Sequence, residues 1–244
     1  MAERHGFGAR QIIAMHGWGR SRHDWANILR AQPALALDLP GFGASSPPAA
    51  ALDTAGYAEL LQPLLGEDQP PILLGHSFGG RIAVQMARRW PARVAGLVLT
   101  GVPLLRAELG GSGGKPKPGY RIGRFLHRHG LLTEQAMGRL REKYGSADYR
   151  RASGVLREIL VKAVNEDYTD ALGEIHRAEL PVRLIWGEHD TAAPVPMARH
   201  AAELIGPTAR LKVVERSAHL LDAALEEELR LALRELLRGS EERR

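Results

Sequence analysis

The sequence predicts an α/β fold, with a mostly parallel sheet of about six or seven strands flanked by helices. Two observations lead to this class: short runs are apolar on both faces, and helix-periodic segments separate them. Strands of this kind are typical of a parallel sheet that helices cover on both sides. The expected strands are 12–15, 34–38, 72–74, 94–100, 182–186 and 211–214.

Helical patterns alternate with these strands. They are expected near 24–30, 54–65, 80–89, 196–205 and 223–237. One interval breaks the alternation, because no strand is evident from 103 to 179, where helical patterns follow a stretch rich in Gly and Pro. We therefore expect an α/β core of residues 1–102 and 180–244, with a helical insertion at 103–179 after the strand that ends near Thr100.

The most informative motif directly follows the third expected strand. Gly75-His76-Ser77-Phe78-Gly79 matches Gly-x-Ser-x-Gly, a sharp strand-to-helix turn that exposes a serine hydroxyl at its tip. Glycine suits a turn so tight that a side chain would collide with the neighbouring backbone. The same five-residue pattern also arises by chance in Gly/Ser loops, so the rest of the chain decides its meaning.

A serine nucleophile needs a base within hydrogen-bonding reach, and the base needs an orienting acid. Asp190 and His219 each follow one of the last two expected strands, which gives the chain order Ser77, Asp190, His219 that is typical of this turn. All three residues follow the carboxyl ends of parallel strands, where open α/β sheets place their ligands. The histidines that we expect to be structural are His16, His76 and His189.

An anionic tetrahedral intermediate also needs backbone N–H donors. One expected donor is the amide of Phe78, directly after the nucleophile. The second is the amide of Trp18, because His16-Gly17-Trp18-Gly19 forms the loop after the first expected strand.

Together these motifs resemble the α/β-hydrolase fold and its serine hydrolases. The resemblance covers about residues 11–237 and is carried by His16-Gly17-Trp18-Gly19, Asp38-Leu39-Pro40-Gly41-Phe42-Gly43, Gly75-His76-Ser77-Phe78-Gly79-Gly80, Trp186-Gly187-Glu188-His189-Asp190 and the His219 segment. It implies an esterase-like enzyme with a Ser-His-Asp triad, a lid at 103–179, and neither cofactor nor metal. Few residues precede Gln11, so at least one N-terminal strand of the family must be missing or very short.

Within that family, the chain is similar to the carboxylesterases that hydrolyse the methyl ester of pimeloyl-carrier protein, through motifs that many other esterases share. The serine nucleophile argues against epoxide hydrolases and haloalkane dehalogenases, which use aspartate. We expect a hydrophobic acyl pocket, and its candidate lining residues are Trp18, Phe42, Leu104, Leu105 and Phe125.

Charge is unevenly distributed along the chain. The formal net charge is +5, and 109–133 contains basic residues and no acid. These basic residues are Lys115, Lys117, Arg121, Arg124 and Arg128. A solvated face is one interpretation, and a rim that steers an acidic carrier protein to the site is the other. No nucleic-acid-binding motif accompanies the basic residues, so we expect no nucleic acid partner.

Composition excludes several other classes. The chain contains no cysteine, which rules out disulfides and thiolate chemistry. Its polar first ten residues do not resemble a secretory signal, and no apolar run reaches the length of a membrane span. A cytoplasmic protein is the expectation.

The function predicted from the sequence is cleavage of a small-molecule carboxylic ester through an acyl-enzyme intermediate. Three alternatives stay open, because the same fold and triad serve each of them. They are a thioesterase or acyltransferase on a carrier-protein or coenzyme A thioester, a C–C bond hydrolase, and a member of the fold that binds a ligand without turnover.

Overall fold

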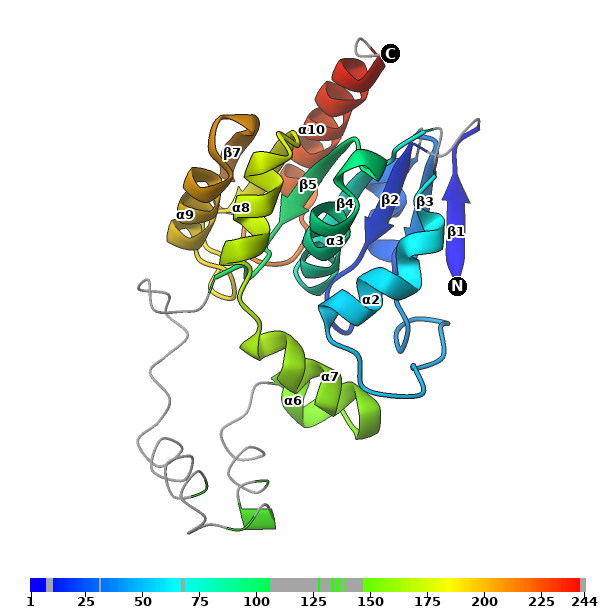
Figure 1. Ribbon diagram of the computed structural model, residues 1–244, viewed down its shortest axis with the longest axis vertical. Helices are drawn as coiled ribbons and strands as arrows, with labels where there is room; N and C mark the ends of the chain where they lie inside the picture. Colours follow the sequence, from blue (N-terminus) through cyan, green and yellow to red (C-terminus); the bar gives the residue numbers. More distant parts are fainter. Residues whose placement is uncertain are drawn as a thin grey trace.

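A seven-stranded sheet forms the centre of the computed structural model, which describes residues 1–7, 11–30, 32–66, 69–105, 127, 133, 135–136, 138 and 147–241 (Figure 1). The strands are β1 (Ala2–His5), β2 (Ile12–Met15), β3 (Ala34–Leu37), β4 (Ile72–His76), β5 (Gly96–Thr100), β6 (Val182–Gly187) and β7 (Ala209–Val214). Their order is β1-β3-β2-β4-β5-β6-β7, and every pair is parallel except β1 with β3. The predicted α/β-hydrolase fold, with a mostly parallel sheet, is confirmed.

Helices cover both faces of the sheet. The helices along the described chain are α1 (Ala26–Leu29), α2 (Thr54–Leu61), α3 (Phe78–Arg89), α6 (Ala147–Arg151), α7 (Gly154–Asn165), α8 (Thr169–Arg177), α9 (Val195–Ile205) and α10 (Ala223–Glu241). Short 3₁₀ turns lie at Arg22–Trp25, Gln62–Leu64, Pro91–Arg93 and Gly206–Thr208. The α2, α3, α8 and α9 helices pack on one face, and α1 and α10 pack on the other. Two separate hydrophobic clusters result, one on each side of the sheet.

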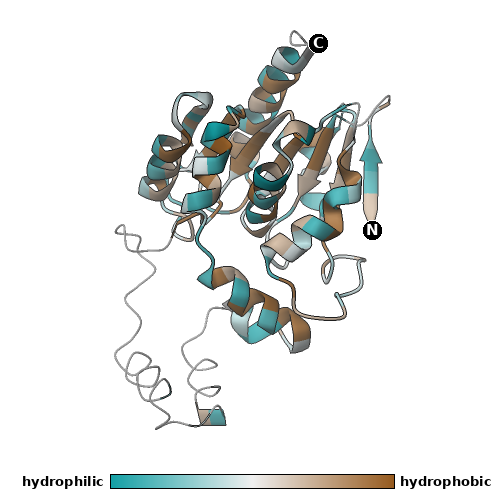
Figure 2. Cartoon of the chain, viewed as in Figure 1, coloured by the Kyte–Doolittle hydropathy of each residue, from teal (hydrophilic) through white to brown (hydrophobic). Residues whose placement is uncertain are grey.

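Alternation along the strands explains these two clusters. In β2, Ile13 and Met15 point into one cluster while Ile12 and Ala14 point into the other, and all four are buried. Successive strand side chains face opposite sides of a sheet, so a strand covered twice is apolar at every position. Figure 2 shows this as strands that are hydrophobic along most of their length.

The β1 strand lacks this apolar pattern, and no sequence pattern predicted it. Its residues alternate between exposed and half-buried at the edge of the sheet, and most are polar (Figure 2). It pairs with β3 from Ala2 opposite Leu37 to His5 opposite Ala34. The N-terminal residues therefore supply one antiparallel strand of four residues ahead of β2.

The insertion expected at 103–179 is described only in part. Its described helices are α6, α7 and α8; α6 and α7 lie beyond the carboxyl ends of the strands, whereas α8 packs against α3 and α9 (Figure 1). Leu156 of α7 faces the loop after β3, where a Cβ on Gly41 would lie 2.4 Å from a Leu156 methyl carbon. Phe125 and the five basic residues at 115–128 lie outside the described residues.

Candidate active site

Ser77 lies on a strained turn between β4 and α3. Its φ is +48°, a conformation that costs a non-glycine residue about 1–3 kcal/mol. Both flanking glycines are required by space: a Cβ on Gly75 would lie 2.4 Å from the Gly80 Cα, and one on Gly79 would lie 2.2 Å from the Met15 carbonyl oxygen. The local sequence therefore places Ser77, which is half-buried, at the tip of the sharp turn that the Gly-x-Ser-x-Gly motif predicts.

The structure brings Ser77, His219 and Asp190 into one chain of contacts. His219 Nε2 lies 3.2 Å from Ser77 Oγ, and His219 Nδ1 lies 2.9 Å from Asp190 Oδ2. Ser77 follows β4, Asp190 follows β6 and His219 follows β7, so three loops converge at the carboxyl end of the sheet. The arrangement can pass the serine proton to the imidazole while the carboxylate holds the other ring nitrogen.

Asp190 is itself held rigidly. Its Oδ1 accepts hydrogen bonds from the backbone amides of Ala192 and Ala193, at 2.9 and 2.8 Å, and its side chain is buried. Next to it, Gly101 has a φ of +56°, and a Cβ there would lie 3.0 Å from both the carboxylate and the His219 Nδ1. The turn after β5 is thus shaped to let the Asp190–His219 pair pack closely.

Two backbone amides near Ser77, those of Trp18 and Phe78, have no acceptor within the described part of the chain. His16 orients the first of them: its Nε2 accepts from the Leu39 amide at 3.1 Å, so its Nδ1 carries the proton and donates to the Gly17 carbonyl at 2.7 Å. In a trans peptide the N–H points opposite to the carbonyl, so the Trp18 amide faces away from His16.

The aromatic side chains of Trp18 and Phe78 pack together with that of Phe42. Trp18 contacts Phe42 and Phe78 edge to face, with ring centroids 4.9 and 5.2 Å apart. Leu104 and Leu105, also expected to line the acyl pocket, are buried in the same hydrophobic cluster as Phe42 and Phe78. Phe125 lies outside the described residues, so its expected place in the pocket stays a prediction.

A polar network joins the nucleophile helix to the inserted helices. Arg81, in the first turn of α3, is buried, donates to the Ala163 carbonyl near the end of α7, and lies 5.9 Å from the ring of Tyr168. The Tyr168 hydroxyl donates to Glu166, whose carboxylate also accepts from the Thr54 amide at 2.9 Å and the Thr54 hydroxyl at 2.6 Å. Burial lowers the pKa of Arg81 and raises that of Tyr168. The network therefore ties α2, α3 and α7 together behind Ser77.

Sequence reasoning missed several of these residues. The Gly101 and Arg81 contacts had no motif, although glycine directly after a strand is a signal for a left-handed turn. His16 and His76 were expected to be structural, and both are buried; both ring nitrogens of His16 contact backbone groups, and His76 contacts one through Nε2. The exposed His189 ring makes no contact with Ser77 or His219 in the described structure.

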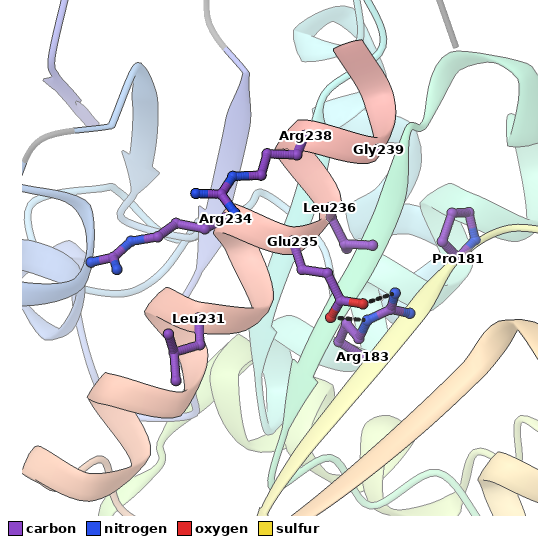
Figure 3. A pocket seen from close by; sticks show the side chains of 8 residues that line it. All are labelled: Pro181, Arg183, Leu231, Arg234, Glu235, Leu236, Arg238 and Gly239. Carbon is purple, nitrogen blue, oxygen red and sulfur yellow. Dashed lines mark hydrogen bonds and ion pairs between the residues drawn. The ribbon is translucent and has the colours of Figure 1, made fainter. Parts of the chain in front are cut away.

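A surface pocket of about 480 Å³ lies at the other end of β6 from Asp190 (Figure 3). There the Arg183 guanidinium binds both Glu235 carboxylate oxygens, each at 2.9 Å, between Pro181 and the last turns of α10. Its lining contains no serine or histidine. The ion pair has a structural role, because it fastens α10 to the start of β6.

The described residues offer neither a metal site nor a membrane-spanning helix. No three His, Asp or Glu side chains gather there in a way that could hold a metal ion. No helix in that part of the chain combines the length and the apolar character needed to cross a membrane.

Comparison with known proteins adds family information to this geometry. Residues 12–231 match the family model described as the alpha/beta hydrolase family. The chain is 29% identical over 228 residues to the pimeloyl-[acyl-carrier protein] methyl ester esterase of Neisseria meningitidis serogroup C, with 86% of each chain covered. It is 30% identical over 250 residues to the 2-hydroxy-6-oxononadienedioate/2-hydroxy-6-oxononatrienedioate hydrolase of Cupriavidus pinatubonensis, covering 88% of this chain and 82% of the relative.

Solved structures share the fold. A thermophilic esterase from Thermogutta terrifontis superposes with a TM-score of 0.66 at 22% identity, over 98% of this chain and 93% of that one. At this level of identity the likeness concerns the architecture of the sheet and its helices.

Proposed function

Because this chain belongs to the alpha/beta hydrolase family, we propose that it is a serine hydrolase that cleaves a carboxylic ester through an acyl-enzyme intermediate. The observation that carries the proposal is the continuous contact from Ser77 through His219 to Asp190. The esterase named among its relatives supports the ester as substrate.

The proposed reaction has two halves. Ser77 Oγ attacks the ester carbonyl carbon while His219 Nε2 takes its proton, and Asp190 stabilises the imidazolium that forms. The Trp18 and Phe78 amides stabilise the oxyanion, and collapse of the intermediate expels the alcohol, which receives the proton from His219. Water then attacks the acyl-enzyme with His219 as base, which releases the acid and restores Ser77.

We propose that the acyl chain lies against Trp18 and Phe42, with Leu104 and Leu105 farther along the pocket. Their rings and aliphatic side chains offer apolar surface beside the serine. Residues 103–179 are proposed to act as a lid over this site, since long segments inserted beside a site usually serve function. The position of α6 and α7 beyond the carboxyl ends of the strands supports this role.

The proposal is tested with p-nitrophenyl esters of increasing acyl length and with a fluorophosphonate probe. The wild-type protein should hydrolyse at least one ester with saturation kinetics, and the probe should label Ser77. The Ser77→Ala variant should lose both properties and keep its thermal unfolding temperature. Equal turnover by wild type and Ser77→Ala would remove the serine mechanism.

An acidic carrier is the proposed source of the acyl group, because a relative bears the name of an esterase for an acyl-carrier-protein ester. The basic residues between 115 and 128 would attract it. Raising the salt concentration should then weaken hydrolysis of a carrier-bound ester far more than hydrolysis of a neutral p-nitrophenyl ester. Equal salt responses would refute the carrier, while leaving the esterase proposal intact.

A second candidate reaction is hydrolysis of a C–C bond in a dienedioate. The relative from Cupriavidus pinatubonensis, named as a hydrolase of such compounds, favours it. Turnover of a vinylogous diketone acid without turnover of any ester would select this reaction over the first.

A further inference from the structure

His76 occupies a central place that the proposed reaction does not use. It is the last residue of β4, directly before Ser77, and it is buried. Its ring lies against the His219 imidazole, with centroids 5.0 Å apart and planes tilted by 46°. Its Nε2 lies 2.9 Å from the backbone carbonyl oxygen of His219. A carbonyl oxygen only accepts hydrogen bonds, so Nε2 must carry a proton and donate it.

The His76 ring is neutral at ordinary pH. Burial, with a further contribution from the His219 imidazole, lowers the pKa of His76 to about 4, against smaller opposite effects of the hydrogen bond to the His219 carbonyl and of Asp24 and Asp190. With the proton on Nε2, Nδ1 is left as a bare acceptor, and it is buried without a partner in the described structure. A second positive charge therefore does not form beside the His219 imidazolium of the proposed reaction.

The opposite edge of the His76 ring packs on the loop that carries the Trp18 amide. A Cβ on Gly17 would lie 2.7 Å from His76 Nδ1 and 3.4 Å from the Ser77 Cβ. Only a glycine allows this close approach. One imidazole therefore touches the loop of the proposed oxyanion donor, precedes the nucleophile in the chain, and holds the backbone of the proposed base.

The segment that carries His219 is otherwise an irregular loop. It runs between the end of β7 and the start of α10, and its earlier part is fixed by the His189 amide donating to the Ser217 carbonyl at 2.8 Å. The bond from His76 is the one hydrogen bond that the His219 carbonyl receives in the described part of the chain. A shift of this backbone moves Nε2 relative to Ser77 Oγ, whose present separation is 3.2 Å.

We propose that His76 is a positioning residue, which holds the backbone of His219 through its Nε2–H···O=C hydrogen bond and so sets the distance between the base and Ser77. The inference rests on the proposed function, because it assigns His76 a part in the same reaction. A residue that only fills space would need the volume of the His76 ring, whereas the proposed role also needs its Nε2–H as a hydrogen-bond donor.

Two variants of nearly equal shape distinguish the effect of losing the hydrogen-bond donor from the effect of losing the volume of the ring. The amide nitrogen of Gln can replace Nε2–H as a donor, whereas Met has the same unbranched length and no donor. We expect His76→Gln to keep kcat within about threefold of wild type, and His76→Met to lose about 10- to 100-fold in kcat with little change in KM. Thermal unfolding of both variants controls for folding. Equal kcat values for folded Gln and Met variants would overturn the proposal.

A measurement on the wild-type protein covers the case in which His76→Met does not fold. Nitrogen-15 NMR of the His76 ring at neutral pH should show a neutral imidazole with its proton on Nε2. A proton on Nδ1, or a charged ring, would overturn the proposal. If the wild-type protein neither hydrolyses esters nor reacts with the fluorophosphonate probe, the proposed function fails, and the NMR result still decides whether the hydrogen bond exists.

Discussion

Glu166 offers the sharpest test of the network that joins α2, α3 and α7. Glu166→Gln keeps the shape of the side chain and removes its charge. Three donors reach this carboxylate: the Thr54 amide at 2.9 Å, the Thr54 hydroxyl at 2.6 Å, and the Tyr168 hydroxyl. The buried Arg81 guanidinium interacts with the same carboxylate through its charge.

The size of the effect follows from these contacts. A hydrogen bond to a charged group contributes about 1.5–3 kcal/mol and a neutral one about 0.5–1.5 kcal/mol, so weakening three bonds costs about 3 kcal/mol. Loss of the counter-charge of Arg81 adds to this cost, while the partial exposure of Glu166 reduces it. We expect the free energy of unfolding to fall by about 3 kcal/mol, which lowers Tm by roughly 6–12 °C in a chain of this length.

Urea and thermal unfolding at neutral pH measure this change. The matched control is Glu158→Gln, an exposed position on α7, which should stay within about 0.5 kcal/mol of wild type. The double variant Arg81→Met/Glu166→Gln should be less destabilised than the sum of its single changes, because it removes both charges of a coupled pair. A Glu166→Gln variant as stable as the control, or strict additivity in the double variant, would refute the reasoning.

Three further predictions concern separate parts of the molecule. Asp190→Asn should lower kcat about 10⁴-fold on a p-nitrophenyl ester, since the wrong imidazole tautomer is then favoured, and a loss below about tenfold would contradict it. Gly79→Ala places a Cβ 2.2 Å from the Met15 carbonyl oxygen and should lower Tm, whereas a Cβ at Gly173 on α8 makes only an ordinary 3.8 Å contact with the Arg177 guanidinium, so Gly173→Ala should leave Tm equal or higher. Burial raises the pKa of Asp38, but hydrogen bonds from two backbone amides and an arginine outweigh it, so the folded pKa lies below 3.8. Asp38→Asn should therefore destabilise the protein fully above that pH and progressively less as the pH falls through the folded value, and equal destabilisation at about pH 7 and pH 3 would contradict it.

The parallel part of the sheet could be predicted because burial on both faces leaves an unmistakable apolar run, as in β2 and β5. The β1 strand could not, because an edge strand with one half-covered face needs no apolar pattern. Its partner residues in β3 are distant in the chain, so pairing depends on the assembled sheet rather than on local propensity.

The same contrast holds at the candidate site. Ser77, Asp190 and His219 could be named from the sequence because each follows a strand in the expected order, and their catalytic roles stay predictions. The contacts of His76 and Glu166 could not be named, because each joins segments that only the folded chain brings together. No local pattern distinguishes a buried histidine that donates to a backbone carbonyl from one that fills space.

The order of the strands has a consequence for the synthesis of the protein on the ribosome. From β4 onward each new parallel strand is added beside the previous one, as β5, β6 and then β7. Domains fold from the N-terminus as synthesis proceeds, so the serine emerges long before the imidazole that lies beyond β7. On the proposed function, the nascent chain therefore has no base for its serine, and it cannot attack cellular esters until every strand of the sheet has been translated.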